Sequence, residues 1–161
     1  MSANKDRDKK FIERAIELSK QGMQGGQGGP FGCVIVMGDE IIAEGNNKVT
    51  SSNDPTAHAE VVAIRNACEK LGTYQLNDCE IFTSCEPCPM CLGAIYWARP
   101  KRVVYANTRE EAALIEFDDE FIYQEINAKM SERKIPFIHH PHPAAQKVFE
   151  EWKNWEGKTK Y

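Results

Sequence analysis

Two short segments of the chain carry the residue types that bind metals and move protons. The first is Thr56-Ala57-His58-Ala59-Glu60, and the second is Pro87-Cys88-Pro89-Met90-Cys91. His58 offers an imidazole, while Cys88 and Cys91 offer two thiolates three positions apart, a spacing that puts both sulfurs on one face of a helix. One nitrogen and two sulfur ligands suit zinc by softness and by number. Three protein ligands leave the fourth tetrahedral position open for water, which is typical of a catalytic zinc.

Glu60 follows His58 by two residues and brings a carboxylate close to this metal site. A carboxylate there can accept a proton from the water and then deliver a proton to a substrate. Because zinc lowers the pKa of bound water from about 16 to about 7, a modest base suffices at neutral pH. His-x-Glu with a downstream Pro-Cys-x-x-Cys is the signature of zinc-dependent base deaminases. The two segments therefore predict hydrolysis of an exocyclic amine.

Other sites could use the same cysteines. The cysteines of Cys85–Cys91 are spaced as at the start of an iron–sulfur run, but Ile95 stands where the fourth cysteine would be. A structural zinc with Cys85 as fourth ligand would leave Glu60 without a role. A non-catalytic zinc-binding or interaction module is the remaining alternative, because one fold hosts many functions. Glu60 favours an enzyme, since a binding module needs no general base there.

Composition indicates one compact globular domain of ordinary character. The 161 residues are 42% hydrophobic and 27% charged, and the net charge is −4. Proteins that hold nucleic-acid backbones usually carry a basic face, so we expect a small neutral substrate and no nucleic-acid partner. No apolar run could span a bilayer, and Met1–Lys10 is polar and charged. We therefore expect a cytoplasmic protein with no membrane partner.

The other cysteines, histidines and glycines receive structural interpretations. In a cytosolic chain, Cys33, Cys68 and Cys79 are interpreted as small buried hydrophobes rather than disulfide partners. His139–His142 is interpreted as an exposed turn before the last helix, with a second metal site as the alternative. The glycine-rich stretch Gly22–Gly29 lacks a Gly-Lys-Ser/Thr ending and precedes a strand, so it is interpreted as a connector and not as a phosphate loop.

Helices and strands must alternate to position the two motifs. Helices are predicted over 6–22, 56–71, 88–98, 110–115, 119–126 and 144–155. Strands are predicted over 32–37, 40–44, 80–84, 102–106 and 135–139. Asp54 or Thr56 is expected to cap the second helix. An initial hairpin followed by alternating elements predicts an α/β layered domain with a mixed sheet.

Longer stretches around both motifs resemble the cytidine deaminase-like superfamily. These stretches are Asn53–Val61 and Thr83–Cys91. Within the superfamily the chain is most similar to the bacterial guanine deaminases. That closer similarity lies in Gly29–Gly32, Gly93–Pro100, Phe117–Tyr123 and Lys160-Tyr161, and it is weakest over Lys129–Trp155.

The resemblance implies a three-layer α/β/α fold with a five-stranded mixed sheet in a single deaminase domain over residues 1–161. It also implies one zinc ion per subunit and a homodimer. In that dimer the C-terminal segment, about residues 144–161, would cross to the partner and help to close the partner's active site.

The resemblance also implies roles that spacing does not. The residues implied to bind substrate are Phe31, Asn47, Ala59, Trp97 and Tyr161. Asn47 would hydrogen-bond the base, and Tyr161 of the partner subunit would cover the bound purine. Asp119 would act beside Glu60 in moving protons. Taken without the resemblance, these residues would be interpreted as core aromatics, a loop residue, a helix cap and a chain end.

The resulting hypothesis is hydrolysis of guanine to xanthine and ammonia, a step of purine catabolism. Glu60 would take a proton from water and pass it to a ring nitrogen. Glu60, with Asp119, would then supply the proton with which ammonia leaves C2. The core motif is shared by enzymes that deaminate guanosine, cytosine or transfer RNA adenosine, so these stay alternative substrates. The net negative charge and a C-terminal tail over the pocket disfavour transfer RNA as the substrate.

Overall fold

The chain divides into two units. The computed structural model describes the backbone of residues 2–161 and the side chains from Lys5 onward. The first unit is Met1–Glu120 and the second is Phe121–Tyr161. The second unit is longer than the segment of about 144–161 that the resemblance sets apart.

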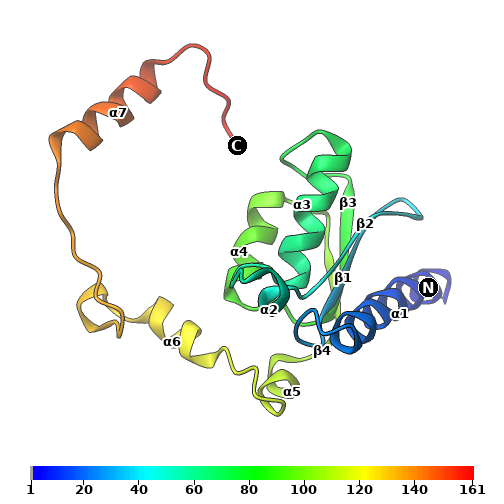
Figure 1. Ribbon diagram of the computed structural model, residues 1–161. Coiled ribbons are helices and arrows are strands. Elements are labelled where there is room, and N and C mark those ends of the chain that lie inside the picture. Colours follow the sequence, from blue (N-terminus) through cyan, green and yellow to red (C-terminus); the bar gives the residue numbers. More distant parts are fainter. Residues whose placement is uncertain (1) are drawn as a thin grey trace. The chain divides into compact units, whose positions relative to one another are not determined.

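A mixed sheet forms the centre of the first unit (Figure 1). Its strands are β1 (Gly32–Met37), β2 (Glu40–Asn46), β3 (Cys79–Cys85) and β4 (Val103–Asn107), in the order β2-β1-β3-β4. Strand β1 is antiparallel to β2 and β3, whereas β3 and β4 are parallel. Gly38 turns the β1–β2 hairpin with a φ of 61°, a left-handed conformation that glycine adopts without strain. The predicted α/β class with a mixed sheet is confirmed.

The expectation of five strands is wrong for the described residues, which form four. The further strand was predicted over 135–139, where the structure has an irregular segment. Pro136 has no N–H to give to a ladder. Ile135 and Ile138 are 72% and 88% exposed, so no burial of alternate side chains stabilises a strand there.

The helices match the predicted ones to within a few residues. They are α1 (Ser2–Gln24), α2 (Val49–Ser52), α3 (Ala59–Leu71), α4 (Pro89–Ala98), α5 (Arg109–Ala113), α6 (Glu120–Asn127) and α7 (Pro143–Asn154), with a 3-10 turn η1 (Met130–Glu132). The short α2 and η1 were not predicted, because a single turn is too short for an amphipathic pattern.

Helix α3 begins later than predicted, at Ala59 instead of Thr56. Asp54 accepts a hydrogen bond from the Thr56 N–H at 2.8 Å, and this bond closes a turn that precedes the helix. The N-cap is His58, and its side chain makes no capping hydrogen bond. The prediction that Asp54 or Thr56 caps the helix is therefore wrong.

Helices cover both faces of the sheet in the first unit, α1 on one face and α3 with α4 on the other (Figure 1). Side chains of β1 and β3 alternate between the two faces. On the α1 face, Phe11 packs against Phe82 with ring centroids 5.1 Å apart. On the α3 face the core contains Ile35, Ile81 and the alanines of α3.

Two glycines let the helices approach the sheet closely. A Cβ on Gly32 would lie 2.2 Å from the carbonyl oxygen of Ala15 in α1, and a Cβ on Gly45 would lie 2.4 Å from the carbonyl oxygen of Ala59 in α3. No side chain fits at such distances. Because Ala59 is the first residue of α3, the contact with Gly45 places the start of that helix directly against β2.

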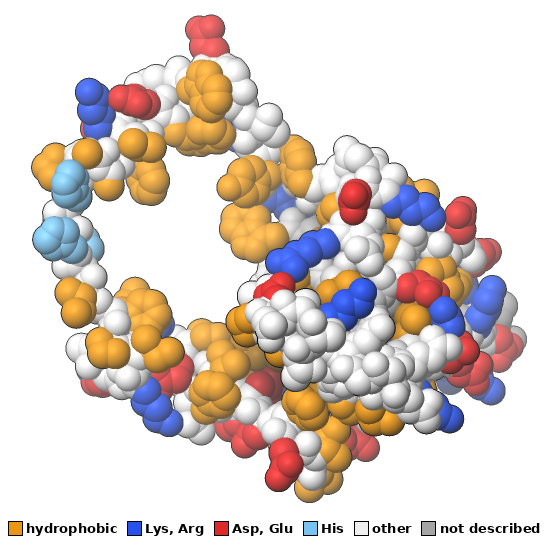
Figure 2. Space-filling model, viewed as in Figure 1, with side chains coloured by type: hydrophobic (Ala, Val, Ile, Leu, Met, Phe, Trp, Pro, Cys, Tyr) orange, Lys and Arg blue, Asp and Glu red, His pale blue; other side chains and the backbone are white. Residues whose placement is uncertain are grey.

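The second unit exposes many apolar side chains. None of the residues of α6, η1 or α7 is buried. Figure 2 shows hydrophobic side chains, in orange, along this segment. Those more than half exposed are Phe121, Ile126, Met130, Ile135, Phe137, Ile138, Val148, Phe149, Trp155 and Tyr161. Apolar surface of this extent is typical of a segment that packs against another chain.

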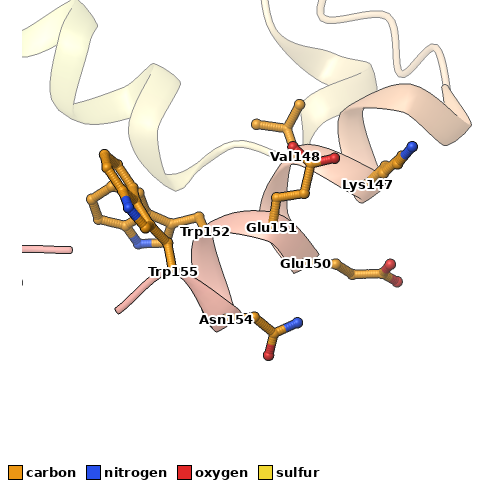
Figure 3. A pocket seen from close by; sticks show the side chains of 7 residues that line it. All are labelled: Lys147, Val148, Glu150, Glu151, Trp152, Asn154 and Trp155. Carbon is orange, nitrogen blue, oxygen red and sulfur yellow. The ribbon is translucent and has the colours of Figure 1, made fainter. Parts of the chain in front are cut away.

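Helix α7 also borders a pocket (Figure 3). Its lining residues, from Lys147 to Trp155, all belong to this one helix and its C-cap, so the pocket has no opposite wall. Trp152 and Trp155 lie edge to face beside it, with ring centroids 5.5 Å apart.

No helix in the described part of the chain combines the length and apolar character that crossing a bilayer requires.

Candidate active site

The two motifs lie at the starts of helices α3 and α4, where each N-cap is a possible metal ligand. His58 is the N-cap of α3 and Cys88 is the N-cap of α4, and both have extended backbones. An N-cap side chain commonly accepts a hydrogen bond from the first turn, but neither of these does. Both side chains therefore stay available for another partner. Pro89 at the first position of α4 costs no hydrogen bond.

His58, Cys88 and Cys91 form a group of three ligand atoms that fits zinc. Their ligand atoms lie within 4.8 Å of one another. Nδ1 of His58 is 3.5 Å from Sγ of Cys88 and 3.5 Å from Sγ of Cys91. A tetrahedral zinc with bonds of about 2.0–2.1 Å to nitrogen and about 2.3 Å to sulfur would separate these atoms by roughly 3.5 Å. The group has the donor set and the spacing of a zinc site with one position left for water.

Cys88 and Cys91 shift each other's pKa in opposite directions. A hydrogen bond from Cys91, and then one from His58, lowers the pKa of Cys88 to about 4 although burial opposes this. The hydrogen bond to Cys88, burial and the charge of Glu60 raise the pKa of Cys91 above its usual range. The bond with Cys88 also raises the pKa of His58. A bound cation would offset the repulsion that opposes the second thiolate.

Cys85 and the histidine-rich tract lie outside this group. The thiol of Cys85 is 3.7 Å from the carbonyl oxygen of Thr108, and burial raises its pKa to about 11. His142 is the N-cap of α7, and its Nδ1 accepts a hydrogen bond from the Ala144 N–H at 3.1 Å. Among the residues with described side chains, His58, Cys88 and Cys91 are the one set of three that meets the spacing of a metal site.

Glu60 is buried beside this group. It is the second residue of α3, and only 5% of its surface is exposed. Oε1 accepts a hydrogen bond from the hydroxyl of Thr83 at 2.8 Å, and Oε2 accepts one from the thiol of Cys91 at 3.3 Å. Burial raises the pKa of Glu60, and these hydrogen bonds offset part of the effect. A carboxylate with a raised pKa is suited to take up and return a proton near neutral pH.

Asp119 lies close enough to Cys88 for their charges to interact. Asp118 is exposed, and its Oδ1 accepts a hydrogen bond from the Glu120 N–H at the start of α6. Asp119 is half-buried, and burial together with the negative charge of Cys88 raises its pKa. The resemblance selected Asp119 for proton transfer, and its surroundings are consistent with that choice.

Asn47 presents a hydrogen-bond donor with a defined orientation. The residue is 5% exposed, and its Oδ1 accepts hydrogen bonds from the N–H groups of Gly29 and Val49 at 3.3 and 3.2 Å. Since these bonds use the amide oxygen, the NH2 group is left to donate to an acceptor. A Cβ on Gly28 would lie 2.2 Å from Oδ1, so this loop also requires its glycine.

Glu86 anchors the helix that follows β4. Its Oε2 accepts a hydrogen bond from the N–H of Arg109, the first residue of α5, at 3.2 Å. Its own N–H donates to the carbonyl oxygen of Asn107 in β4. Glu86 therefore links the cysteine segment to the start of α5.

The other residues predicted to bind substrate lie in different settings. Ala59 is fully buried at the start of α3, Phe31 is half-buried, Trp97 of α4 is 62% exposed, and Tyr161 ends the second unit at 68% exposed. Phe31 packs edge to face on Phe117, with ring centroids 4.9 Å apart.

Sequence reasoning assigned no role to two neighbours of this site, Phe117 and Thr83. Phe117 was named only as the first residue of Phe117–Tyr123, a stretch similar to the bacterial guanine deaminases. Thr83 could have been found from strand alternation, because it lies two residues after Ile81 and therefore on the same face of β3, the face that α3 covers.

Comparison with known proteins identifies the family. Residues 5–107 match the model of the cytidine and deoxycytidylate deaminase zinc-binding region. The matched region contains all three candidate metal ligands and Glu60. This chain belongs to the cytidine and deoxycytidylate deaminase family.

Known deaminases differ in how much of this chain they match. The chain is 57% identical to guanine deaminase of Bacillus subtilis, over 94% of this chain and 97% of the relative. The X-ray structure of guanine deaminase from Bacillus subtilis superposes with a TM-score of 0.93, at 56% identity, over 95% of this chain and 98% of that one. A transfer RNA-specific adenosine deaminase of Aquifex aeolicus is 38% identical over 60% of this chain and 63% of the relative. A structure of guanine deaminase from Nitrosomonas europaea has a TM-score of 0.64, at 32% identity, over 68% of this chain and 63% of that one.

Proposed function

We propose that this deaminase hydrolyses guanine to xanthine and ammonia in the cytoplasm. The observation that carries the choice of guanine is the extent of the similarity. The match to the Bacillus subtilis guanine deaminase covers 94% of the chain, whereas the match to the Aquifex aeolicus transfer RNA enzyme covers 60%. The motif residues are common to both kinds of relative, so the remaining length of the chain is what separates them.

His58, Cys88 and Cys91 are the residues that would hold one zinc ion per subunit. When bound, zinc supplies Lewis acidity that lowers the pKa of a water molecule to about 7. The roles of the protein side chains follow from their positions around this group.

Glu60 moves the protons of the reaction. Its Oε2 lies on the side of the cysteines, where it can accept a proton from the attacking water. The same carboxyl group passes this proton to a ring nitrogen of guanine. It then takes the proton of the hydroxyl group that has been added to C2 and delivers it to the amino group, which leaves as ammonia. Asp119 is half-buried and close to the negative charge of Cys88, and it assists the proton transfer to the amino group. The water's oxygen ends on C2, and the C2–N bond breaks.

The base is held by one oriented donor and by apolar walls. The Asn47 NH2 group donates to an acceptor atom of the purine, since the amide oxygen is already used by backbone N–H groups. Phe31, Ala59 and Trp97 contact the ring. Phe117 supports Phe31 through their edge-to-face contact.

The functional unit is a homodimer in which residues 121–161 of each chain pack on the other chain. Two observations support this. Helices α6 and α7 bury no residue, although this unit carries many large apolar side chains. In the first unit, β4 is an edge strand whose Tyr105 is 47% exposed. An open edge presents unpaired backbone N–H and C=O groups with which another chain can pair. Tyr161 of the partner subunit would then cover the purine.

Ammonia release from a set of amines tests the choice of substrate. We expect guanine to react at least about 100-fold faster than guanosine, cytosine or adenine, because a site built around specific hydrogen bonds rejects molecules that leave them unmade. Coupled detection of ammonia gives kcat/KM for each compound, and a transfer RNA with an unpaired adenosine serves as a further substrate. Faster reaction of any of these than of guanine would refute the proposal.

Mixing two inactive variants tests the exchange of the C-terminal unit. One partner is Glu60→Gln with an intact C-terminus, and the other keeps Glu60 but lacks residues 156–161. In an exchanged dimer, a mixed pair has one complete site, so random mixing in equal amounts should restore roughly a quarter of the wild-type activity. Without exchange, every site lacks either the Glu60 carboxyl group or residues 156–161, and the mixture should stay inactive. The same zero result would follow if the variants were kept apart, so formation of mixed dimers is verified by mass.

A further inference from the structure

We infer that Thr83 is a positioning residue that orients the carboxyl group of Glu60 for proton transfer. The inference rests on the proposed function, because it concerns the side chain that we propose to move protons. It assigns a role to a hydroxyl that belongs to neither of the two motifs.

Thr83 lies in the centre of the fold. It is in β3, is fully buried, and pairs with Cys33 of β1. Alternation along β3 puts Thr83 on the same face as Ile81, the face that α3 covers. This face otherwise carries apolar side chains. A hydroxyl there needs a hydrogen-bond partner, since an unpaired buried polar group is unfavourable.

The hydroxyl has two acceptors within reach and only one proton to donate. Oε1 of Glu60 is 2.8 Å away, whereas the carbonyl oxygen of Gly32 is 3.4 Å away. The shorter distance is ideal for an O–H donor and the longer one is marginal. The proton therefore belongs to the bond with Glu60.

This bond makes the two oxygens of Glu60 different from each other. Oε1 is held by Thr83, and Oε2 is left on the side of Cys91, at 3.3 Å from its sulfur. Because Thr83 is fully buried, water cannot easily take its place. Without the hydroxyl, the carboxyl group could rotate, and fewer molecules would hold Oε2 in line with the water and the base.

Ser84 is a matched control for this role. It is the next residue of β3, and it is also a buried hydroxyl, at 6% exposed. Its Oγ accepts a hydrogen bond from the Gly32 N–H at 3.0 Å and has no described contact with Glu60. Removing it should disturb packing to a similar degree without freeing the carboxyl group.

The test compares Thr83→Val, Thr83→Ser and Ser84→Ala with the wild-type enzyme. Val keeps the shape of Thr and removes the hydroxyl, and it should lower kcat for guanine by about 10- to 100-fold. KM should change less than about threefold, and the zinc content should stay equal to that of the wild type. Ser keeps the hydroxyl and should restore kcat to within about threefold of wild type. Ser84→Ala should keep kcat within about twofold.

Three results would overturn the inference: unchanged kcat in Thr83→Val, an equal loss in Ser84→Ala, or loss of zinc from Thr83→Val. If Thr83→Val does not fold, Thr83→Ala replaces it and is compared with Thr83→Ser, since both lack the methyl group and differ in the hydroxyl. Guanine turnover by the wild type is measured in parallel. A wild type that releases no ammonia from guanine refutes the proposed function, whereas an active wild type with a fully active Thr83→Val refutes only this inference.

Discussion

Glu60→Gln should lower ammonia release from guanine by about 10²–10⁴-fold, the range expected when a general acid–base group is removed. Glutamine has nearly the same size as glutamate and can still accept the hydrogen bond from Thr83 at its amide oxygen. The amide cannot take up the proton of a water molecule. The variant should therefore fold, keep zinc and bind guanine, and the loss should appear in kcat.

Glu69→Gln is the control for this variant. Glu69 lies near the other end of the same helix α3 and is exposed, so its replacement should change kcat by less than about twofold. Metal analysis and circular dichroism of both variants would separate a chemical defect from a folding defect. If Glu60→Gln kept more than about a tenth of the wild-type kcat, Glu60 would not be the general base.

Cys91→Ser should remove zinc and abolish activity. The sulfur of Cys91 is 3.5 Å from Nδ1 of His58, so its loss leaves two of the three protein ligands. A serine hydroxyl is a poor zinc ligand, because it does not ionise near neutral pH as a zinc-bound thiol does. We expect the zinc content, measured by mass spectrometry of the metal, to fall from one ion per chain to near zero.

Cys85→Ser makes this experiment decisive between a catalytic and a structural zinc. Cys85 lies six residues before Cys91, but its thiol faces the carbonyl oxygen of Thr108 and not the group of three ligands. The variant should keep its zinc. Loss of zinc from Cys85→Ser would mean four protein ligands and no position for water, and the deaminase mechanism would then be wrong. Addition of a chelator to the wild type, followed by zinc, provides a reversible version of the same test.

The metal-binding group was largely predictable from the sequence. Cys88 and Cys91 are three positions apart at the start of a predicted helix, a spacing that puts both sulfurs on one face. His58 and Glu60 belong to the His-x-Glu half of the same deaminase signature. The strands β1 to β4 and the longer helices were also predictable, because each carries its own periodic apolar pattern. The ends of these elements were less predictable. The start of α3 depends on the turn at Asp54 and on the contact between Gly45 and Ala59, which are properties of the loop and of packing.

The surroundings of the group depended on the tertiary structure. Thr83 and Glu60 are 23 positions apart, and they meet only because β3 and the start of α3 lie against each other. Similarly, the orientation of the Asn47 amide depends on Gly29, which is 18 positions away. The effect of the Cys88 charge on Asp119 likewise joins residues from distant parts of the chain. Hydrogen bonds and electrostatic fields act through space, so residue spacing along the chain does not reveal them.

The strand predicted over 135–139 also shows that local sequence is not sufficient to predict the sheet. Residues 135–139 have strand-forming side chains, but a strand forms only where it pairs with another strand, and these residues pair with no strand of the described chain. What the sequence by itself determined about this protein is the pattern of candidate ligands, the candidate general base and the local elements, because these follow from residue type and from spacing within a few turns. Only the tertiary structure decided how Glu60 is oriented, what fixes Asn47 and how many strands form, because each of these depends on partners from distant parts of the chain.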